Sequence, residues 1–248
     1  MQAIIQTKQL SKHYGKTQVL NNIDLTVNQG EFTAIMGPSG SGKSTLMNVL
    51  STIDRLSGGD VWLKGQSLLA LNKRALREFR QSHMGFIFQD YNLLDTLNVK
   101  ENILLPLSLR NVKTPEMEAR LKAIAEALGI ESILEKYPSE ISGGQKQRAA
   151  SARAIITEPS IVFADEPTGA LDSRSATGLL EQLVHLNVTF GTTILMVTHD
   201  PYAASYCSRV IFLRDGGIVS ELYAGDQGHR AFYDRILDTQ SLLGGGKR

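Results

Sequence analysis

The chain has 248 residues, of which 42% are hydrophobic and 21% are charged, which suits one large domain or one domain with a substantial insertion. The net charge of +1 gives no long-range attraction to nucleic acid, so no nucleic-acid partner is expected. The single cysteine, Cys207, excludes an internal disulfide and favours the reducing cytoplasm. No secretory signal follows Met1, and no apolar run approaches the ~20 residues that span a bilayer. A protein of this kind would reach a membrane only through a partner.

The first part of the chain predicts a strand, a glycine-rich loop and a helix in direct succession. Val19–Val27 alternates as a strand should and ends at a turn. Glu31–Met36 is an apolar strand that leads directly into Gly37–Ser44, which has the form G-x-x-x-x-G-K-S. Ser44–Leu50 follows as a helix. A phosphate-binding loop needs this context, because its amides and the helix N-terminus face the phosphates together.

The loop predicts ATP or GTP as the ligand. Its glycines let backbone amides approach the phosphate oxygens, Lys43 reaches the β- and γ-phosphates, and the Ser44 hydroxyl binds Mg²⁺. The alternative is a glycine-rich turn that contains Lys-Ser by chance. The loop residues expected to bind the nucleotide are Ser39, Gly40, Ser41, Gly42, Lys43, Ser44 and Thr45.

The middle of the chain changes from strands to helices. The elements expected first are a turn at Ser57–Asp60, a strand at Val61–Leu63, a helix at Asn72–Ser82 and a strand at Met84–Phe88. Residues 90–157 are predicted to be mostly helical, with one helix that starts at Thr114–Pro115 and stops at Gly129.

The last part of the chain returns to alternating elements. They are a strand at Ile161–Ala164, a helix at Ser173–Leu186, a strand at Thr193–Val197 and a hairpin of Val210–Arg214 with Ile218–Leu222. The tail from Gly225 holds one predicted helix, Arg230–Leu243, which we expect to be a solvated terminal helix.

Two carboxylates follow one apolar strand, and a histidine follows another. Asp165 and Glu166 end the strand from Ile161, and His199 comes after the strand to Val197. In a parallel sheet these ends lie at one edge, where ligands bind. Asp165 then suits Mg²⁺, Glu166 the attacking water, and His199 the γ-phosphate and that water. The alternatives are an ordinary acidic turn and a solvated histidine.

Two further side chains have a functional and an ordinary interpretation. Gln89 ends the strand from Met84, where the helical segment begins, and its amide could sense the γ-phosphate, the metal or the water. A glutamine in a loop is otherwise simply solvated. Tyr14 could stack on adenine, or it could pack as part of an N-terminal strand.

A second glycine-rich turn opens a predicted helix in the middle of the chain. Ser142, Gly144 and Gln145 belong to the string Ile141–Gln145, and the helix dipole and free amides there point at an anion. The alternative is an ordinary helix capped by Ser142. One nucleotide does not need two phosphate sites, whereas two copies placed head to tail do.

Together these motifs resemble one family, the nucleotide-binding subunits of ABC transporters, over residues from about Ile4 to Leu222. Their counterparts in the family are the adenine-stacking aromatic (Tyr14), the Walker A loop (Gly37–Ser44), the Q-loop (Gln89), the signature (Ile141–Gln145), the Walker B pair (Asp165, Glu166), the D-loop (Ala170–Asp172) and the switch histidine (His199). The one departure is Ile141 where leucine is usual, an exchange of one apolar residue for another.

The resemblance implies an α/β fold with a P-loop NTPase core of the RecA type, an inserted helical subdomain and a short antiparallel β element. We expect residues 1–89 and 158–224 to form the ATP-binding core with its N-terminal β element, residues 90–157 the helical signature subdomain, and residues 225–248 a C-terminal tail.

The resemblance also implies an ATPase cycle between two copies of the chain. ATP would be bound by Tyr14 and the Walker A loop of one copy, and by Ser142, Gly144, Gln145 and Asp172 of the other. The implied metal ligands are Ser44, Gln89 and Asp165, and the implied catalytic residues are Lys43, Gln89, Glu166 and His199.

Within the family, two stretches are similar to the bacitracin-type antimicrobial-peptide resistance transporters, Gly85–Leu97 and Thr198–Cys207. Phe163–Asp172 is similar to the macrolide-export and lipoprotein-release branch. The likeness implies work at the cytoplasmic face of a bacterial membrane, on a large permease that in this group often also engages a membrane sensor kinase. The alternatives are a lipoprotein-release, macrolide-export or cell-division complex, or a non-transport ATPase of the superfamily.

The apolar residues near Gln89–Leu107 are candidates for the permease-docking surface. They are Leu93, Leu94, Leu97, Ile103 and Leu104. The alternative is that they pack the core of the helical segment itself.

Overall fold

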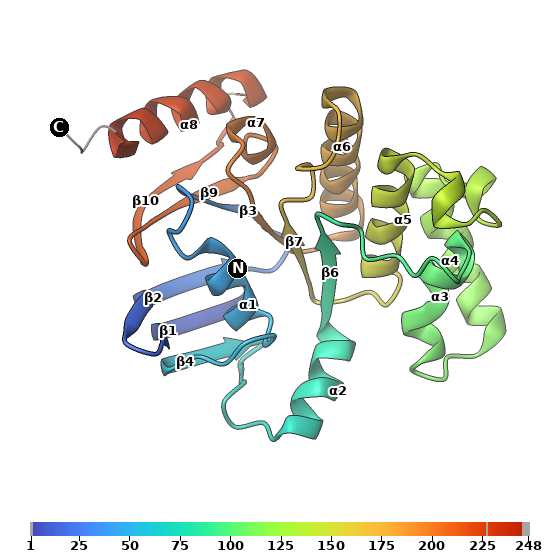
Figure 1. The fold of residues 1–248 in the computed structure, drawn as a ribbon, viewed down its shortest axis with the longest axis horizontal. Coiled ribbons are helices and arrows are strands. Elements are labelled where there is room, and N and C mark those ends of the chain that lie inside the picture. The colour runs from blue at the N-terminus through green and yellow to red at the C-terminus, as the bar shows by residue number, and fades with distance from the viewer. Residues whose placement is uncertain (1, 227, 245–248) are drawn as a thin grey trace.

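The computed structural model describes residues 2–226 and 228–244, and its framework is two sheets (Figure 1). The larger sheet has the order β10-β9-β3-β8-β7-β6 and the smaller one the order β2-β1-β4-β5. The strands of the larger sheet are β3 (Phe32–Met36), β6 (Met84–Phe88), β7 (Ile161–Asp165), β8 (Ile194–Val197), β9 (Arg209–Arg214) and β10 (Gly217–Tyr223). Those of the smaller sheet are β1 (Ala3–Tyr14), β2 (Thr17–Asn28), β4 (Gly58–Leu63) and β5 (Gln66–Ser67).

Parallel pairing dominates the larger sheet. The pairs β6–β7, β7–β8, β8–β3 and β3–β9 are parallel, and β10 adds an antiparallel edge to β9. The smaller sheet is antiparallel throughout. The predicted α/β core with an added antiparallel β element is therefore confirmed.

Eight α-helices surround the sheets within the described residues. They are α1 (Lys43–Leu50), α2 (Lys73–His83), α3 (Val99–Ser108), α4 (Thr114–Leu128), α5 (Gly143–Ile155), α6 (Ser173–Phe190), α7 (Pro201–Ala204) and α8 (Gly228–Gly244). Two short 3-10 turns, Glu131–Ile133 and Pro138–Glu140, lie between α4 and α5. No helix in this part of the chain is long and apolar enough to cross a membrane.

The helices α3, α4 and α5 pack on one another beside β6 (Figure 1). The signals for α4 are local: Pro115 lies in its first turn, and Gly129 ends it in the left-handed conformation with φ 59°. Asn98 begins α3 with a reciprocal capping box to Glu101. These caps explain why the helical segment was predictable from the sequence.

The apolar residues proposed as a docking surface divide between two environments. Ile103 and Leu104 are buried in the core beside α5, so the prediction that they form a surface is wrong for them. They occupy the inward face of α3, which packs on α5. Leu93 and Leu97 are half-buried, and only Leu94 is exposed.

The prediction of a turn at Ser57–Asp60 is also wrong, because β4 already begins at Gly58. Glycine is needed there for a close approach between strands. A Cβ on Gly59 would lie 2.3 Å from the carbonyl oxygen of Gln9 in β1, and Gly59 has φ +82°. The glycine pair therefore marks an irregular strand crossing.

The core lies on both faces of the larger sheet. One cluster joins the sheet to α3–α6 and α8, and the other joins it to α1 and the antiparallel sheet. The tail belongs to the first cluster, since Phe232 and Ile236 of α8 are fully buried. The expected solvated terminal helix is therefore wrong. Within the predicted tail, Gln227 and residues 245–248 lie outside the described residues.

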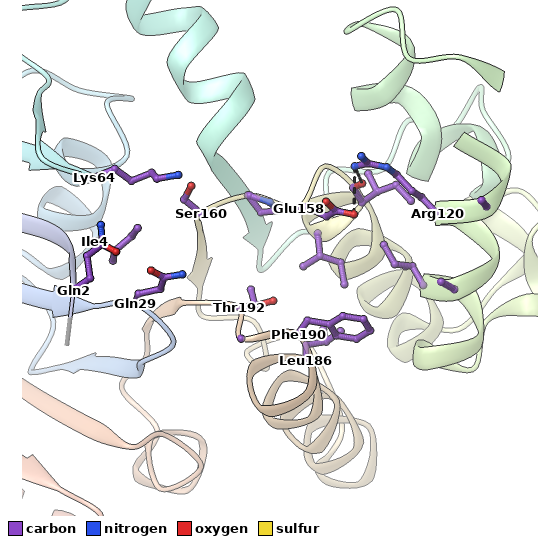
Figure 2. A pocket seen from close by; sticks show the side chains of 17 residues that line it. Gln2, Ile4, Gln29, Lys64, Arg120, Glu158, Ser160, Leu186, Phe190 and Thr192 are labelled. Atoms are coloured by element: carbon purple, nitrogen blue, oxygen red, sulfur yellow. Dashed lines mark hydrogen bonds and ion pairs between the residues drawn. The ribbon is translucent and has the colours of Figure 1, made fainter. Parts of the chain in front are cut away.

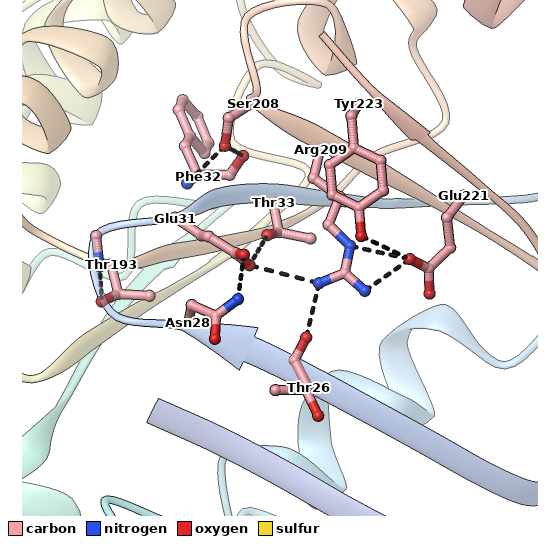
Figure 3. A network of polar contacts seen from close by, with 11 residues as sticks. Thr26, Asn28, Glu31, Phe32, Thr33, Thr193, Ser208, Arg209, Glu221 and Tyr223 are labelled. Carbon is pink, nitrogen blue, oxygen red and sulfur yellow. Dashed lines mark hydrogen bonds and ion pairs between the residues drawn. The ribbon is translucent and has the colours of Figure 1, made fainter. Parts of the chain in front are cut away.

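A buried arginine ties the two sheets together (Figure 3). Arg209, at the start of β9, donates to Glu221 of β10 at 2.7 Å and to the carbonyl of Thr26 in β2 at 2.6 Å. A longer contact of 3.4 Å reaches Glu31, which precedes β3. The Tyr223 ring covers the guanidinium with its centroid 5.4 Å away.

We expect Arg209→Met to lower the free energy of unfolding by about 1.5–3 kcal/mol, because the buried guanidinium loses its charge-assisted hydrogen bonds to the half-buried Glu31 and the more exposed Glu221. Urea denaturation followed by circular dichroism measures the change. Arg74→Met is the matched control: it breaks the fully exposed pair with Glu78 and should leave the free energy of unfolding nearly unchanged. Equal losses in the two variants would contradict a structural role for the Arg209 network.

Candidate functional site

Four neighbouring parallel strands end at one edge of the larger sheet. Phe88 of β6 pairs with Asp165 of β7, and Asp165 pairs with Val197 of β8. Val197 in turn pairs with Ile35 of β3, which leads into the phosphate loop. Each strand therefore delivers its next residue to the same edge, where ligands bind in open α/β sheets.

The phosphate loop packs closely on its neighbours. A Cβ on Gly37 would lie 2.1 Å from the carbonyl oxygen of Leu213, and Gly42 begins α1 with φ 100°. Only glycine suits these two positions. Ser39, Gly40 and Ser44 are exposed, whereas Ser41 is buried with a hydroxyl oxygen that has no hydrogen-bond partner among the described residues.

Lys43 lies folded against its own loop. Its ammonium donates to the carbonyls of Gly37 at 2.8 Å and Pro38 at 2.9 Å. Burial lowers the pKa of Lys43, while attraction to Glu166 and Asp165 acts in the opposite direction. A phosphate brought to this loop would offer the ammonium a charged partner in place of two carbonyls.

Asp165 and Glu166 lie side by side at the end of β7. Burial raises the pKa of Asp165, the Glu166 carboxylate raises it further, and Lys43 lowers it. The Asp165 Oδ1 atom is buried without a hydrogen-bond partner in the described structure. Such an orphan carboxylate oxygen fits a hard cation or its bound water, since Mg²⁺ is commonly held by one or two carboxylates together with phosphate.

Glu166 and His199 form a direct pair. The Nδ1 atom of His199 lies 2.9 Å from Oε1 of Glu166. The Glu166 side chain is 19% exposed, and that of His199 is 72% exposed. Glu166 has φ 44°, a left-handed backbone conformation that few non-glycine residues adopt. The turn after β7 therefore aims this carboxylate at the histidine.

Gln89 and Tyr14 contact different neighbours of the predicted site residues. The Gln89 amide lies against Gly169, which follows Glu166, since a Cβ on Gly169 would be 3.0 Å from the Gln89 nitrogen. Tyr14 ends β1, is 49% exposed, and donates to Asp54. The hydrogen bond to Asp54 raises the pKa of Tyr14, and a hydrogen bond with Thr45 of α1 lowers it. Tyr14 thus stands beside the helix that the phosphate loop begins.

The signature residues lie elsewhere in the same chain. Ser142 caps α5, and its side chain and that of Gln145 form a reciprocal capping box. Ser142 and Gly144 line a cavity of about 210 Å³ with Arg148, Arg174 and Gln182 rather than with the phosphate loop. In Figure 1, α5 and α1 lie on opposite sides of β6. The chain presents this helix terminus outward, with two arginines beside it.

Asp172 lies at the start of α6, next to this cavity. Its carboxylate accepts from the backbone of Arg174 and Ser175 and from the Ser175 hydroxyl. These bonds, that of the Ser175 hydroxyl first, lower the pKa of Asp172. Asp172 is exposed, and its contacts within one copy of the chain are those of an ordinary helix cap.

The structure adds a connection that the sequence did not reveal. Arg153 of α5 donates to the carbonyls of Tyr91 at 2.8 Å and of Asn92, two residues with φ of 60° and 50°. The Tyr91 hydroxyl lies against Gly143, where a Cβ would be 2.9 Å away. The segment after Gln89 is therefore fastened to the signature helix. The one sequence signal for this connection is Asn92, because asparagine favours the left-handed conformation of a turn.

A cavity of about 840 Å³ lies at the other edge of the sheet (Figure 2). Ser160 and Thr192, which precede β7 and β8, line it together with Phe190 at the end of α6 and Arg120 of α4. None of the predicted site residues borders it. Its size is that of a ligand pocket, but the predicted chemistry lies at the opposite strand ends.

Comparison with known proteins gives one consistent result. A family model described as ABC transporter matches residues 20–169. The chain is 56% identical over 247 residues to the bacitracin export ATP-binding protein BceA of Halalkalibacterium halodurans. This match covers 98% of this chain and 98% of the relative. It is 43% identical over 221 residues to the lipoprotein-releasing system ATP-binding protein LolD of Psychrobacter arcticus, with 87% of this chain and 98% of the relative covered.

The fold is similar to that of the solved ABC transporter cassette MJ0796, described as bacterial and dimeric. The TM-score is 0.80 at 36% identity, over 89% of this chain and 98% of that chain. A second structure of MJ0796, in a post-hydrolysis state with ADP and Pi, gives a TM-score of 0.79 at 35% identity over the same shares.

We expect Asp165→Asn to make the isolated chain more stable at neutral pH and inactive in hydrolysis. Because the pKa of Asp165 is raised in the folded state, its charged form destabilises the fold at pH values above that pKa. The gain in Tm should shrink as the pH falls through the folded-state pKa and vanish near the ordinary value of 3.8. Thermal unfolding across this pH range measures the difference.

Asp238→Asn, an exposed change on α8, is the control and should leave both Tm and turnover unchanged. If Asp165→Asn gains nothing at neutral pH, burial of the Asp165 charge has no energetic consequence.

Proposed function

The chain belongs to the ABC transporter family and is an ATP-binding subunit that hydrolyses ATP, and from this premise we propose that it drives the export of bacitracin-type antimicrobial peptides. The observation that carries the proposal is the 56% identity to BceA over 98% of both chains. The coverage includes the stretches around Gln89 and after His199, where the chain already resembles peptide-resistance transporters.

We propose that the phosphate loop and Tyr14 bind one ATP. The amides of Ser39–Gly42 would face the phosphates, Lys43 would leave the Gly37 and Pro38 carbonyls for the β- and γ-phosphates, and Tyr14 would stack on adenine. The unpartnered Ser41 hydroxyl and the position of Thr45 beside Tyr14 support this assignment.

Glu166 is the proposed base for the attacking water. The Nδ1 atom of His199 holds the Glu166 carboxylate in position, and the Nε2 atom is then left to face the γ-phosphate. Mg²⁺ would neutralise charge on the phosphates when bound, and Ser44, Gln89 and the orphan oxygen of Asp165 are the groups proposed to hold it or its waters. Lys43 adds a positive charge at the same place, so positioning and electrostatics supply most of the rate.

The second half of each site is proposed to come from a second copy. Ser142, Gly144, Gln145 and Asp172 lie outside the phosphate-loop site of their own chain but present a helix terminus and amides to the exterior. MJ0796, with 36% identity, is described as dimeric. We therefore propose a core of residues 1–89 and 158–224, a signature subdomain of residues 90–157, and two copies arranged head to tail.

The proposed docking surface for the permease is a groove between β6 and α3. Its volume is about 370 Å³, and Phe86, Phe88, Leu105, Pro106 and Leu109 line its apolar part. Leu109 is 67% exposed, and Arg80, Arg110 and Arg153 border the groove. An apolar wall with a cationic rim suits a short permease helix with an acidic residue. Docking there would place the chain at the cytoplasmic face of the membrane.

A second candidate function is lipoprotein release, which the 43% identity to LolD supports. Isolation of the chain from native membranes, with identification of the co-purified membrane protein, separates the two. A permease with a large extracellular domain, accompanied by a sensor kinase, is the result expected for peptide resistance. A lipoprotein-release permease would overturn the peptide proposal and leave the ATPase mechanism intact.

We expect Glu166→Gln to bind ATP with unchanged affinity and to hydrolyse it about 100–10,000-fold more slowly, the usual contribution of a general base. Because the nucleotide then persists, an ATP-dependent dimer should accumulate and be visible in size-exclusion chromatography. Glu181→Gln, an exposed change on α6, is the matched control. Unchanged turnover in purified Glu166→Gln would remove Glu166 from the reaction.

We expect Ser142→Arg to leave ATP binding by the monomer unchanged and to lower turnover by about 100-fold or more, because the bulky cation blocks the copy that should close over the nucleotide. Equilibrium binding of a fluorescent ATP analogue and phosphate release measure the two effects. Ser132→Arg, also exposed in the helical segment, should change neither. A loss of nucleotide affinity in the monomer would contradict a site shared between two chains.

A further inference from the structure

The C-terminal helix α8 lies near the phosphate loop at one end and contacts α7, which follows His199, at the other. It lies along β9 and β10 and packs against α7 (Figure 1). Phe232 and Ile236 anchor its middle in the core. Near its other end, Gln240 and Leu243 line a cavity of about 160 Å³ together with Gly37 and Pro38 of the phosphate loop. The helix therefore spans the distance from α7 to the phosphate loop.

The first contact is a small aromatic cluster. The His229 ring of α8 meets the Tyr206 ring edge-on, with centroids 3.9 Å apart at 89°. The Tyr206 and Tyr202 hydroxyls lie 2.9 Å apart, and Tyr202 lies 3.0 Å from Thr177 of α6. Burial and the bond to Tyr202 raise the pKa of Tyr206, so its hydroxyl stays neutral. The cluster joins α8 to α7 and α6.

The helix α7 follows directly after the switch histidine. Asp200 caps α7 by accepting from the Tyr202 amide at 2.9 Å, and its own amide donates to the Thr198 hydroxyl at 3.0 Å. The backbone of His199 is thus held between the end of β8 and the start of α7. Because the His199 side chain is 72% exposed, its position relative to Glu166 depends on this backbone segment.

The second contact is at the phosphate loop. The Arg214 guanidinium, at the end of β9, donates to the Leu243 carbonyl of α8. The preceding residue, Leu213, packs against the start of the phosphate loop: a Cβ on Gly37 would lie only 2.1 Å from the Leu213 carbonyl oxygen. The end of α8 and the start of the loop therefore rest on the same two residues of β9.

We propose that α8 is a positioning element of the ATPase site, with Tyr206 and His229 as positioning residues that hold α7, and through it His199, in place beside Glu166. The proposal rests on the assignment of His199 and Glu166 made above. MJ0796 is matched over 98% of its length but covers 89% of this chain, whereas BceA covers 98%.

The test compares His229→Ala and Tyr206→Phe in the full chain. His229 is exposed, so its substitution removes the ring contact without opening the core. In His229→Ala we expect kcat to fall by about 3–10-fold, as loss of an edge-to-face ring contact allows. Tyr206→Phe keeps the ring but loses the hydroxyl bond to Tyr202, and it should lower kcat in the same direction. In both variants the ATP dissociation constant should stay within twofold of the parent. His229→Phe, which keeps a ring, should restore kcat. Leu242→Ala, on an 82% exposed position of the same helix, is the control.

A spectroscopic readout separates positioning from general stability. The imidazole Hε1 resonance of His199, assigned with His199→Ala, should shift in His229→Ala and stay in place in Leu242→Ala, while Tm changes little in both. Unchanged kcat and an unmoved His199 resonance in both test variants would overturn the proposal. If His199→Ala itself leaves turnover intact, the assignment of His199 fails instead, so the two failures are distinguishable.

Discussion

The in-register parallel pairing of β6, β7, β8 and β3 is the constraint on which the rest of the site depends. Because parallel strands end at the same edge, Gln89, Asp165, Glu166 and His199 come together with the phosphate loop although long stretches of chain separate them. Arg209 supports this arrangement from the side, where it joins β9 and β10 to β2 of the antiparallel sheet. The site is a consequence of strand order and register.

Several groups at this edge are less well satisfied than the core beneath them. Asp165 has a buried oxygen without a partner, Glu166 has a left-handed backbone, and Lys43 binds carbonyls of its own loop. Backbone strain and an unpaired buried polar atom each lower the stability of a fold. Here the proposed ligands would supply the missing charge partners of two of these groups, a cation for Asp165 and a phosphate for Lys43, whereas the backbone of Glu166 stays as it is. Local stability is exchanged for binding and catalysis.

The remaining parts connect this edge to other surfaces. Arg153 and the Tyr91 hydroxyl join the segment after Gln89 to the signature helix α5, at whose start Ser142 lies. The groove that Leu109 borders begins at the same segment. On the other side, α8 reaches α7 and the phosphate loop. The edge is thus connected within this chain to the signature helix, to the groove proposed for the permease and to the C-terminal helix.

The sequence by itself determined the local features: the phosphate loop between β3 and α1, the bounds of α4 from Pro115 and Gly129, and the polar residues at each strand end. Capping and periodicity act within a few residues, so they can be read without neighbours. Only the tertiary structure decided that Ile103 faces the core and that Gly59 belongs to a strand. It also decided that Phe232 anchors the tail in the core and that Arg153 binds the carbonyl of Tyr91. These depend on contacts between distant segments, whose free energy no local pattern encodes.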